Sequence, residues 1–362
     1  MSKVLYIGNY KENTGWGNAA VNNILAIDSA GINVVPRAVA YELKDDAPYP
    51  DRIKQLEANS SYDCNICIQH VLPHLFSYDS NYKNIGFMAV ESALFRRTGW
   101  VESANLMDEI WVPSLVTKAH CRLSGIKVPI NVVPHSLNLN EFNEEKTVKV
   151  QQLESTFNFI FIGEFIERKN IAAFIKAFYT EFDNFEPVNL VIKTSQATAS
   201  NVETYVNNIT NGLKIRKKYK PPIVISGMID RKIYTSILKQ CHSFVMPSRG
   251  EAFCIPALEA MACGIPIIWT ENTGLDDFAV GHKIQSHEVP CFGAVTGIPF
   301  LDNSRSYWQE IDLRKLQFAM RSAFMKWNTE DSTKESKQAK EKAKEYTHES
   351  IGKHIKELLN DR

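Results

Sequence analysis

The stretch that decides the fold is His242–Trp269, which reads HSFVMPSRGEAFCIPALEAMACGIPIIW. An apolar run ends at Pro247, and a short polar loop follows it. A helical pattern then begins near Pro256 and ends at Gly264, in front of a second apolar run. Proline suits the first turn of a helix, and glycine suits the position just past its end. A strand, a helix and a second strand in this order are the repeating unit of a parallel α/β sheet.

The same alternation continues on the N-terminal side of this unit. The second half of the chain contains the apolar runs FNFIFIGEF, VNLVIKT and PPIVISG, with the helical pattern IAAFIKAFYTEF after the first of them. The first half contains VLYIG, INVVPRAVA, CNICIQ, NIGFMAV, EIWVPS and INVVPHS, and its helical pattern GNAAVNNILAIDSAG ends at Gly31. We therefore predict an α/β protein with two doubly wound, Rossmann-like domains.

The length of 362 residues suits two domains of about 100–200 residues each. We assign residues 1–140 to the first domain, the polar residues 141–155 to a linker, and residues 156–345 to the second domain. Residues 346–362 form a C-terminal helix that we expect to cross back onto the first domain. The tail from Ser332 onward is rich in Lys, Glu and Ala, which predicts one or two exposed helices.

Composition excludes several classes of protein. The 41 Lys and Arg residues balance 41 Asp and Glu residues, so no basic excess favours nucleic acid as a partner. No apolar run approaches the ~20 residues that a membrane helix needs, and the polar start of the chain does not resemble a signal peptide. The seven cysteines are an odd number in apolar surroundings, which predicts a reduced, cytoplasmic protein.

Two glutamates flank the helix of the opening stretch. Glu251 lies in the loop and Glu259 on the helix, with seven residues between them. The start of a helix carries partial positive charge and unpaired N–H groups, so it suits a diphosphate. A carboxylate on each side could accept hydrogen bonds from two sets of sugar hydroxyls. We expect the diphosphate at the backbone of Ala252, Phe253, Cys254 and Ile255.

This stretch closely resembles the signature of the family 4 (group 1) glycosyltransferases, in which two glutamates are separated by seven residues. Further matches occur in the expected order at GWGNAAVNNILAI, VVPHSLNLNEF and GEFIERKNIAAFIKAF. The resemblance implies the GT-B fold, in which two Rossmann-like domains face each other across a cleft. It also implies a retaining mechanism.

The resemblance implies roles for four residues of the second domain. Glu251 would hold hydroxyls of the donor sugar, and Glu259 those of the nucleotide ribose. Arg168 and Lys169 would neutralise the departing diphosphate. Of these two cations, Arg168 is the one that we expect to point outward, because adjacent residues at a helix start face different directions. Relatives often have Arg where Glu164 stands here, so few cations are left for the diphosphate.

Five further positions follow from the resemblance. Gly227 and Met228, after the strand PPIVIS, would receive the base, and Gly15 and Gly17 would let the backbone approach a ligand closely. Many relatives have a histidine after the strand that corresponds to NIGFMAV. Glu91 stands there in this chain, and it is our candidate for contact with the acceptor. Arg249 and Lys193 are the next candidates for the diphosphate, should Arg168 and Lys169 fail.

The resulting hypothesis is a retaining transferase that moves a hexose from a UDP- or GDP-sugar to a hydroxyl of a glycan, a lipid or another acceptor. The sequence contains no Asp-x-Asp triplet, so we expect no metal and no other cofactor. Two alternatives stay open: a nucleotide-sugar epimerase of the same fold, and a non-catalytic subunit that binds sugar nucleotides. The sequence does not identify the sugar, the base or the acceptor.

Three features also admit simpler readings. The two glutamates would be ordinary at a helix start and on a helix surface. The pattern Cys64-x-x-Cys67-x-x-His70-x-x-x-His74 invites a zinc site, but its pairs are too close together for a zinc finger, and we favour buried cysteines. The basic run LKIRKKYKPP at 213–222 is either a solvated loop, which we favour, or a weak peripheral contact with a membrane.

Overall fold

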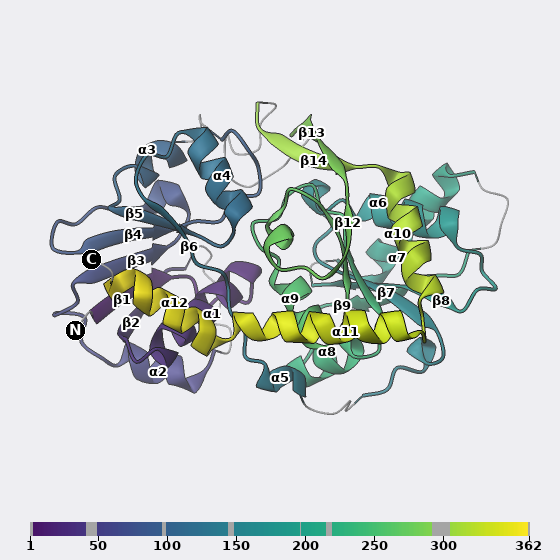
Figure 1. Ribbon diagram of the computed structural model, residues 1–362, viewed down its shortest axis with the longest axis horizontal. Coiled ribbons are helices and arrows are strands. Elements are labelled where there is room, and N and C mark those ends of the chain that lie inside the picture. Colours follow the sequence, from purple (N-terminus) through teal and green to yellow (C-terminus); the bar gives the residue numbers. More distant parts are fainter. Residues whose placement is uncertain are drawn as a thin grey trace. The chain divides into compact units, whose positions relative to one another are not determined.

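The chain folds into two compact units in a computed structural model that describes residues 3–40, 49–95, 99–143, 148–195, 197–214, 219–291 and 305–360 (Figure 1). Of these residues, the first unit takes 3–138, 305–306 and 345–360, and the second takes 139–291 and 307–344.

The first unit is built on a parallel sheet of six strands in the order β2-β1-β3-β4-β5-β6. The strands are β1 (Lys3–Gly8), β2 (Asn33–Ala38), β3 (Ile66–His70), β4 (Lys83–Phe87), β5 (Glu109–Val112) and β6 (Ile130–Val132). They are rich in buried Val and Ile, as expected for a parallel sheet covered on both faces. The strand order reverses between β1 and β3, which is where doubly wound sheets bind ligands.

The first unit has helices from the N-terminal part of the chain and one helix from its C-terminal end. They are α1 (Gly15–Ser29), α2 (Asp51–Glu57), α3 (Trp100–Ala104), α4 (Leu115–Ser124) and α12 (His348–Asn360). Helix α12 packs on α1, where Ile351, Ile355 and Leu359 are buried. Gly352 approaches so closely that an added Cβ would lie 2.2 Å from the carbonyl oxygen of Ala26. The expectation of an exposed tail is therefore wrong for α12, because every third or fourth residue of this charged helix is apolar.

The second unit has its own parallel sheet of six strands, in the order β12-β11-β10-β7-β8-β9. The strands are β7 (Phe157–Ile162), β8 (Val188–Thr194), β9 (Ile223–Ser226), β10 (Ser243–Met246), β11 (Ile267–Thr270) and β12 (Gly281–Ile284). Here the order reverses between β7 and β10. Two Rossmann-like domains were predicted, and the two parallel sheets confirm this fold class.

Helices and a small extra sheet complete the second unit. The helices are α5 (Asn140–Asn143), α6 (Ile171–Glu181), α7 (Ala199–Gly212), α8 (Arg231–Leu238), α9 (Ile255–Ala262), α10 (Leu313–Met325) and α11 (Glu330–Ala343). The short turns η3 (Glu167–Lys169) and η4 (Gly274–Asp277) follow β7 and β11. Strands β13 (Ser286–Pro290) and β14 (Tyr307–Ile311) pair antiparallel to each other. None of the described helices has the length and apolar character needed to span a bilayer.

Candidate functional site

The predicted site residues of the second unit gather where its strand order reverses. Strand β7 is followed by η3, which carries Arg168 and Lys169, and β10 is followed by the loop that carries Glu251. The two strands are hydrogen-bonded neighbours, so their carboxyl ends lie side by side. An open α/β sheet binds ligands at this position, because the loops diverge there and leave room between them.

The carboxylate of Glu251 lies against both cations of η3. Lys169 Nζ donates a hydrogen bond of 2.7 Å to Glu251 Oε1, and Arg168 Nη1 lies 3.4 Å from the same oxygen. Arg168 Nη1 also donates to the carbonyl of Gly250 at 2.6 Å. The expectation that Arg168 points outward is therefore wrong. In the tight turn of η3, consecutive side chains reach the same carboxylate.

Burial and charge act in opposite directions on Glu251, whose side chain is only 5% exposed. Burial acts to raise the pKa of its carboxyl group, but Lys169 and Arg168 outweigh burial, and the net shift is downward. Glu251 is thus a carboxylate at neutral pH. Two cations thus face the carboxylate of Glu251.

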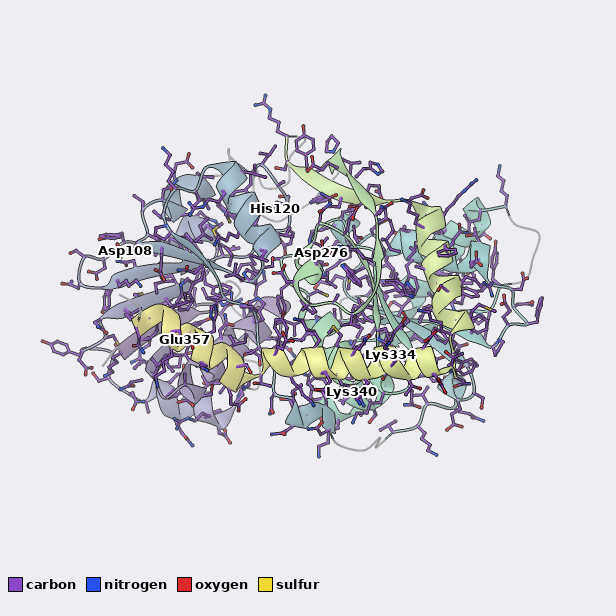
Figure 2. The ribbon with its side chains drawn as sticks, viewed as in Figure 1. Asp108, His120, Asp276, Lys334, Lys340 and Glu357 are labelled. Atoms are coloured by element: carbon purple, nitrogen blue, oxygen red, sulfur yellow. The ribbon has the colours of Figure 1, made fainter. Side chains whose placement is uncertain are left out.

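The backbone of the Glu251 loop is fixed by a close approach of η4. Gly274 N donates to the carbonyl of Glu251 at 2.7 Å, and a Cβ added at Gly274 would lie 2.1 Å from the carbonyl oxygen of Ala252. Asp276, labelled in Figure 2, lies in η4. It secures the turn by accepting a hydrogen bond of 2.8 Å from Trp269 Nε1. Only glycine fits at position 274 without moving the loop.

The predicted diphosphate segment leads directly into α9. Ala252, Phe253, Cys254 and Ile255 are all buried, and Cys254 precedes the helix with φ at 84°. The amides of Cys254 and Ile255 donate no hydrogen bond to any residue that the structure describes. This is usual for the first turn of a helix, whose N–H groups lack partners within it.

Glu259 lies on α9 and is held by two residues of α8. Arg231 Nη2 lies 2.7 Å from Glu259 Oε1, and Tyr234 Oη donates to Glu259 Oε2 at 2.5 Å. Arg231 also donates to Glu141 at 2.8 Å, and its guanidinium lies 5.0 Å from the ring centre of Phe142. Each carboxylate oxygen of Glu259 thus has one protein donor and capacity for another.

The loop proposed for the base follows β9. Gly227 adopts a left-handed conformation with φ at 76°, and Met228 is 61% exposed. Lys193 Nζ donates to the carbonyl of Gly227 at 2.8 Å, and burial lowers the pKa of this lysine. Lys193, a reserve candidate for the diphosphate, therefore braces the loop after β9.

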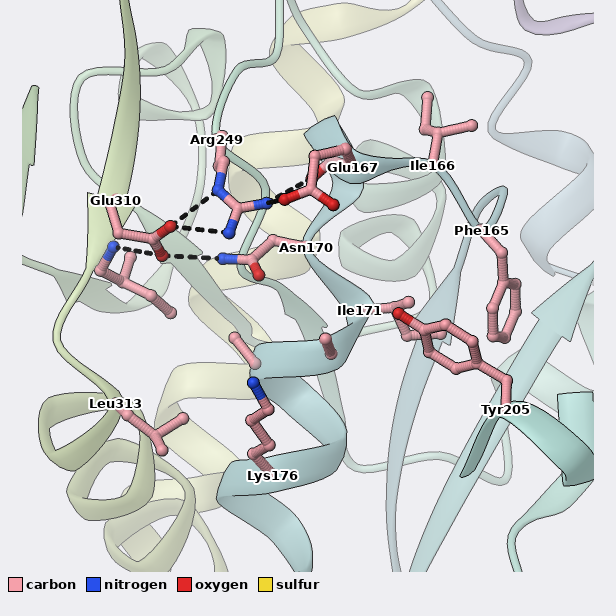
Figure 3. A pocket seen from close by; sticks show the side chains of 13 residues that line it. Phe165, Ile166, Glu167, Asn170, Ile171, Lys176, Tyr205, Arg249, Glu310 and Leu313 are labelled. Atoms are coloured by element: carbon pink, nitrogen blue, oxygen red, sulfur yellow. Dashed lines mark hydrogen bonds and ion pairs between the residues drawn. The ribbon is translucent and has the colours of Figure 1, made fainter. Parts of the chain in front are cut away.

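Arg249, the other reserve candidate, is paired with two carboxylates (Figure 3). Arg249 Nη1 lies 2.6 Å from Glu167 Oε1, and Arg249 Nη2 lies 2.7 Å from Glu310 Oε2. Its backbone N–H also donates to the carbonyl of Arg168 at 2.7 Å. Arg249 thus ties the Glu251 loop to η3 and β14, which leaves Arg168 and Lys169 as the cations at Glu251.

Gly15, Gly17 and Glu91 belong to the first unit, where Gly15 and Gly17 begin α1. A Cβ added at Gly15 would have no atom within 4 Å of it. A Cβ added at Gly17 would lie 1.9 Å from the carbonyl oxygen of Glu12. Gly17 is therefore required by the packing of its own loop. Glu91 lies four residues after the end of β4 and is half-buried.

The residues of the zinc alternative lie before, on and after β3. Cys64 and Cys67 are buried, and the ring of His70 packs against Phe87 with ring centres 4.4 Å apart. Burial lowers the pKa of both His70 and the neighbouring His135, to about 3 for His135. Within the described residues, no group of three or more His, Cys, Asp or Glu side chains is placed to hold a metal ion.

The sequence of the second unit matches a known protein family. Residues 143–290 match the family model described as Glycosyl transferases group 1. Over this segment the chain is similar to the group 1 glycosyltransferases. The family resemblance drawn from the sequence is thereby confirmed, and the matched segment contains Arg168, Lys169, Glu251 and Glu259.

Curated relatives match parts of the chain. A probable sucrose-phosphate synthase of Thermosipho melanesiensis is 30% identical over 169 residues, which are 45% of this chain and 38% of that protein. An uncharacterized glycosyltransferase of Methanocaldococcus jannaschii is 25% identical over 219 residues, 60% of this chain and 48% of that one. The matches thus span less than half the length of these relatives.

Solved structures match the whole chain at low sequence identity. A glycosyltransferase from Rickettsia africae superposes with a TM-score of 0.68 at 11% identity, over 99% of this chain and 98% of that one. A protein of Anabaena in complex with UDP and glucose superposes with a TM-score of 0.68 at 10% identity, over 100% of both chains. The sucrose-phosphate synthase of Thermosynechococcus elongatus gives 0.65 at 15% identity, over 100% of this chain and 99% of that one. These likenesses show the fold, which is that of the GT-B glycosyltransferases.

Sequence reasoning missed the two partners of Glu259. Arg231 and Tyr234 are three residues apart and therefore share one face of α8. That spacing signals only an amphipathic helix. Nothing in it shows that this helix lies against α9, which begins 17 residues after α8 ends.

Proposed function

We propose that the protein is a retaining hexosyltransferase that uses a UDP- or GDP-sugar as donor and a hydroxyl of a glycan, a lipid or another small molecule as acceptor. The observation that carries the proposal is the contact of Lys169 and Arg168 with the buried Glu251, beside the start of α9. The proposal is supported further by the group 1 family match over this segment.

The proposed reaction needs positive charge at the leaving group. When the bond between sugar and diphosphate breaks, negative charge grows on the diphosphate and positive charge on the sugar ring. Lys169 and Arg168 would meet the diphosphate together with the N–H groups at the start of α9. Glu251 would accept hydrogen bonds from the sugar hydroxyls while it keeps the two cations in place.

Glu259 would bind the ribose of the donor. Arg231 and Tyr234 hold its carboxylate in one orientation, and each oxygen can accept one more hydrogen bond. Two ribose hydroxyls fit this remaining capacity. Because the ribose is remote from the breaking bond, we assign Glu259 to donor affinity.

For the acceptor side, we propose a role for Glu91 of the first unit. Glu91→Gln should reduce transfer while it leaves the affinity for the nucleotide nearly unchanged. A large loss of nucleotide binding in this variant would place Glu91 at the donor.

The seven cysteines are all free thiols, which supports a reducing, cytoplasmic location as part of the proposal. A weak peripheral contact of the basic run at 213–222 with a membrane is a minor part of the proposal. Residues 215–218 of that run lie outside the described residues.

The proposal is tested by donor hydrolysis, in which water replaces the unknown acceptor. The intact protein is incubated with UDP-glucose, UDP-galactose, UDP-N-acetylglucosamine, GDP-glucose and GDP-mannose, and the products are followed by proton NMR. We expect release of UDP or GDP from at least one donor, with the α-anomer of the sugar appearing first. A β-anomer that appears first would contradict retention, and an epimerised nucleotide sugar would show an epimerase.

The same assay tests the absence of a metal requirement. Two side-chain cations and a helix start can stabilise the diphosphate without a metal. We expect the hydrolysis rate to survive EDTA. A complete loss of activity that Mg²⁺ or Mn²⁺ restores would overturn this part of the proposal.

A further inference from the structure

A pocket of about 560 Å³ lies in the second unit, beside the candidate site (Figure 3). Its walls come from the segment before α6, the first turns of α6, one residue of α7, strand β14 and the start of α10. Neither Glu251, Glu259 nor Lys169 lines it. The volume lies within the range of small-molecule sites.

One wall of the pocket is aromatic and apolar. The rings of Phe165 and Tyr205 meet edge to face, with centres 5.2 Å apart. Tyr205 and Ile166 are 38% and 39% exposed, so part of this wall faces the space of the pocket. Such a surface packs well against the C–H face of a sugar ring.

Polar groups with unused hydrogen-bonding capacity line the same space. Asn170 is 5% exposed and donates to Glu310 through its amide nitrogen, whereas its carbonyl oxygen accepts no hydrogen bond from the residues described. The hydroxyl of Tyr205 and the ammonium of Lys176 likewise make no hydrogen bond within the described part of the chain. The pocket therefore offers one acceptor, one hydroxyl and one cationic donor.

The charges around the pocket balance. Lys176 and Arg249 supply two positive charges, and Glu167 and Glu310 supply two negative ones, both of them paired with Arg249. A nucleotide or a sugar phosphate would find no excess positive charge here. A neutral ligand that both donates and accepts hydrogen bonds fits this balance best.

We propose that this pocket binds a neutral saccharide unit, with its ring against Tyr205 and Phe165 and its hydroxyls on Asn170 and Lys176. The inference goes beyond the proposed function, because a sugar held here is not the nucleotide sugar. It does not require that the protein transfer anything.

The test is a binding titration of the intact protein, by saturation-transfer NMR, with glucose, galactose, mannose and sucrose, each up to about 100 mM. We expect at least one of these sugars to bind. Tyr205→Ala should raise its Kd about tenfold or more, and Lys176→Gln about threefold. Tyr62→Ala is the matched control, because Tyr62 is 96% exposed and lies in the first unit.

Three results would overturn the proposal. The first is that none of the four sugars binds. The second is binding that survives Tyr205→Ala but is lost in Glu251→Gln, which would assign the sugar to the candidate donor site. The third is a preference of about tenfold or more for glucose 6-phosphate over glucose, which would show an anion site. Tyr205→Ala should leave donor hydrolysis intact, so a failure here is distinct from a failure of the proposed function.

Discussion

Lys169 Nζ lies 2.7 Å from Glu251 Oε1, although the two residues are 82 positions apart in the sequence. The contact joins the loops that follow β7 and β10, the two strands at which the order of the second sheet reverses. A buried carboxylate and two cations thus lie where this kind of sheet binds its ligand.

Removal of either cation at Glu251 should slow the reaction. A charge-assisted contact that strengthens as the diphosphate departs contributes ~3–4 kcal/mol, by analogy with oxyanion donors. Lys169→Ala should therefore lower kcat by ~100-fold or more, with a smaller effect on donor affinity. Because Arg168 reaches the same oxygen of Glu251, we expect Arg168→Ala to lower kcat by at least ~10-fold.

Steady-state kinetics check these two variants after circular dichroism confirms that they fold. Lys334→Ala is the control, since Lys334 is exposed on α11 (Figure 2). If both η3 variants retained more than about a tenth of the wild-type kcat, the diphosphate site would have to lie elsewhere.

Glu251 should make the stability of the protein depend on pH. Its pKa in the folded state is lowered from the ordinary value of 4.5, so its carboxylate stabilises the folded state above that pH. This contribution disappears as the pH falls through the lowered pKa. The difference in unfolding free energy between the wild type and Glu251→Gln should therefore be largest at neutral pH and shrink below pH 4.5.

Urea unfolding at several pH values measures this difference. Glu341→Gln serves as a control, because Glu341 pairs with Lys344 at the surface and a surface pair contributes little. A difference for Glu251→Gln that stayed constant from neutral to acidic pH would show that its ion pairs do not stabilise the fold.

Tyr234 should act through the orientation of Glu259. Tyr234→Phe removes the hydroxyl that donates to Glu259 Oε2 but keeps the ring. A lost hydrogen bond to a charged group costs about 1.5 kcal/mol, so the donor KM should rise about tenfold. We expect kcat to stay within about twofold, since the ribose is remote from the breaking bond.

Tyr179→Phe is a matched control for this change, because the Tyr179 hydroxyl also donates a hydrogen bond but to the carbonyl of Lys220. A drop in kcat with an unchanged KM in Tyr234→Phe would mean that Glu259 does not hold the donor nucleotide.

Gly274 should tolerate no side chain. The Cβ of Gly274→Ala would lie 2.1 Å from the carbonyl oxygen of Ala252, so the loop that carries Glu251 would have to move. Such overpacking costs about 1–3 kcal/mol, and we expect a lower melting temperature together with weaker donor binding. Gly212→Ala, at a position with open space around it, should leave both unchanged. Equal melting temperatures for Gly274→Ala and the wild type would contradict this packing.

The sequence predicted the parallel sheets well, because strands such as FNFIFI are apolar along their whole length and are followed by helices. It did not predict β13 and β14, whose segments SHEVP and YWQEI are mixed in polarity and are 16 residues apart. The sequence did not predict the turn η3 either. The side chains of the adjacent residues Arg168 and Lys169 were expected to point in different directions. Pairs such as Arg231 with Glu259 depend on which helix faces which, and hydrophobic periodicity does not determine this.

The central claim is that the second unit binds a nucleotide sugar through Glu259 and the cluster at Glu251. Thermal unfolding of the intact protein in a panel of UDP- and GDP-sugars tests it most directly, because a ligand that binds the folded state raises the melting temperature. We predict that at least one nucleotide sugar raises the melting temperature of the wild type, and that the increase is much smaller in Glu259→Gln. Lys169→Ala, whose main loss is expected in kcat, should keep most of the increase. No increase with any donor, or an equal increase in the wild type and in Glu259→Gln, would contradict the claim.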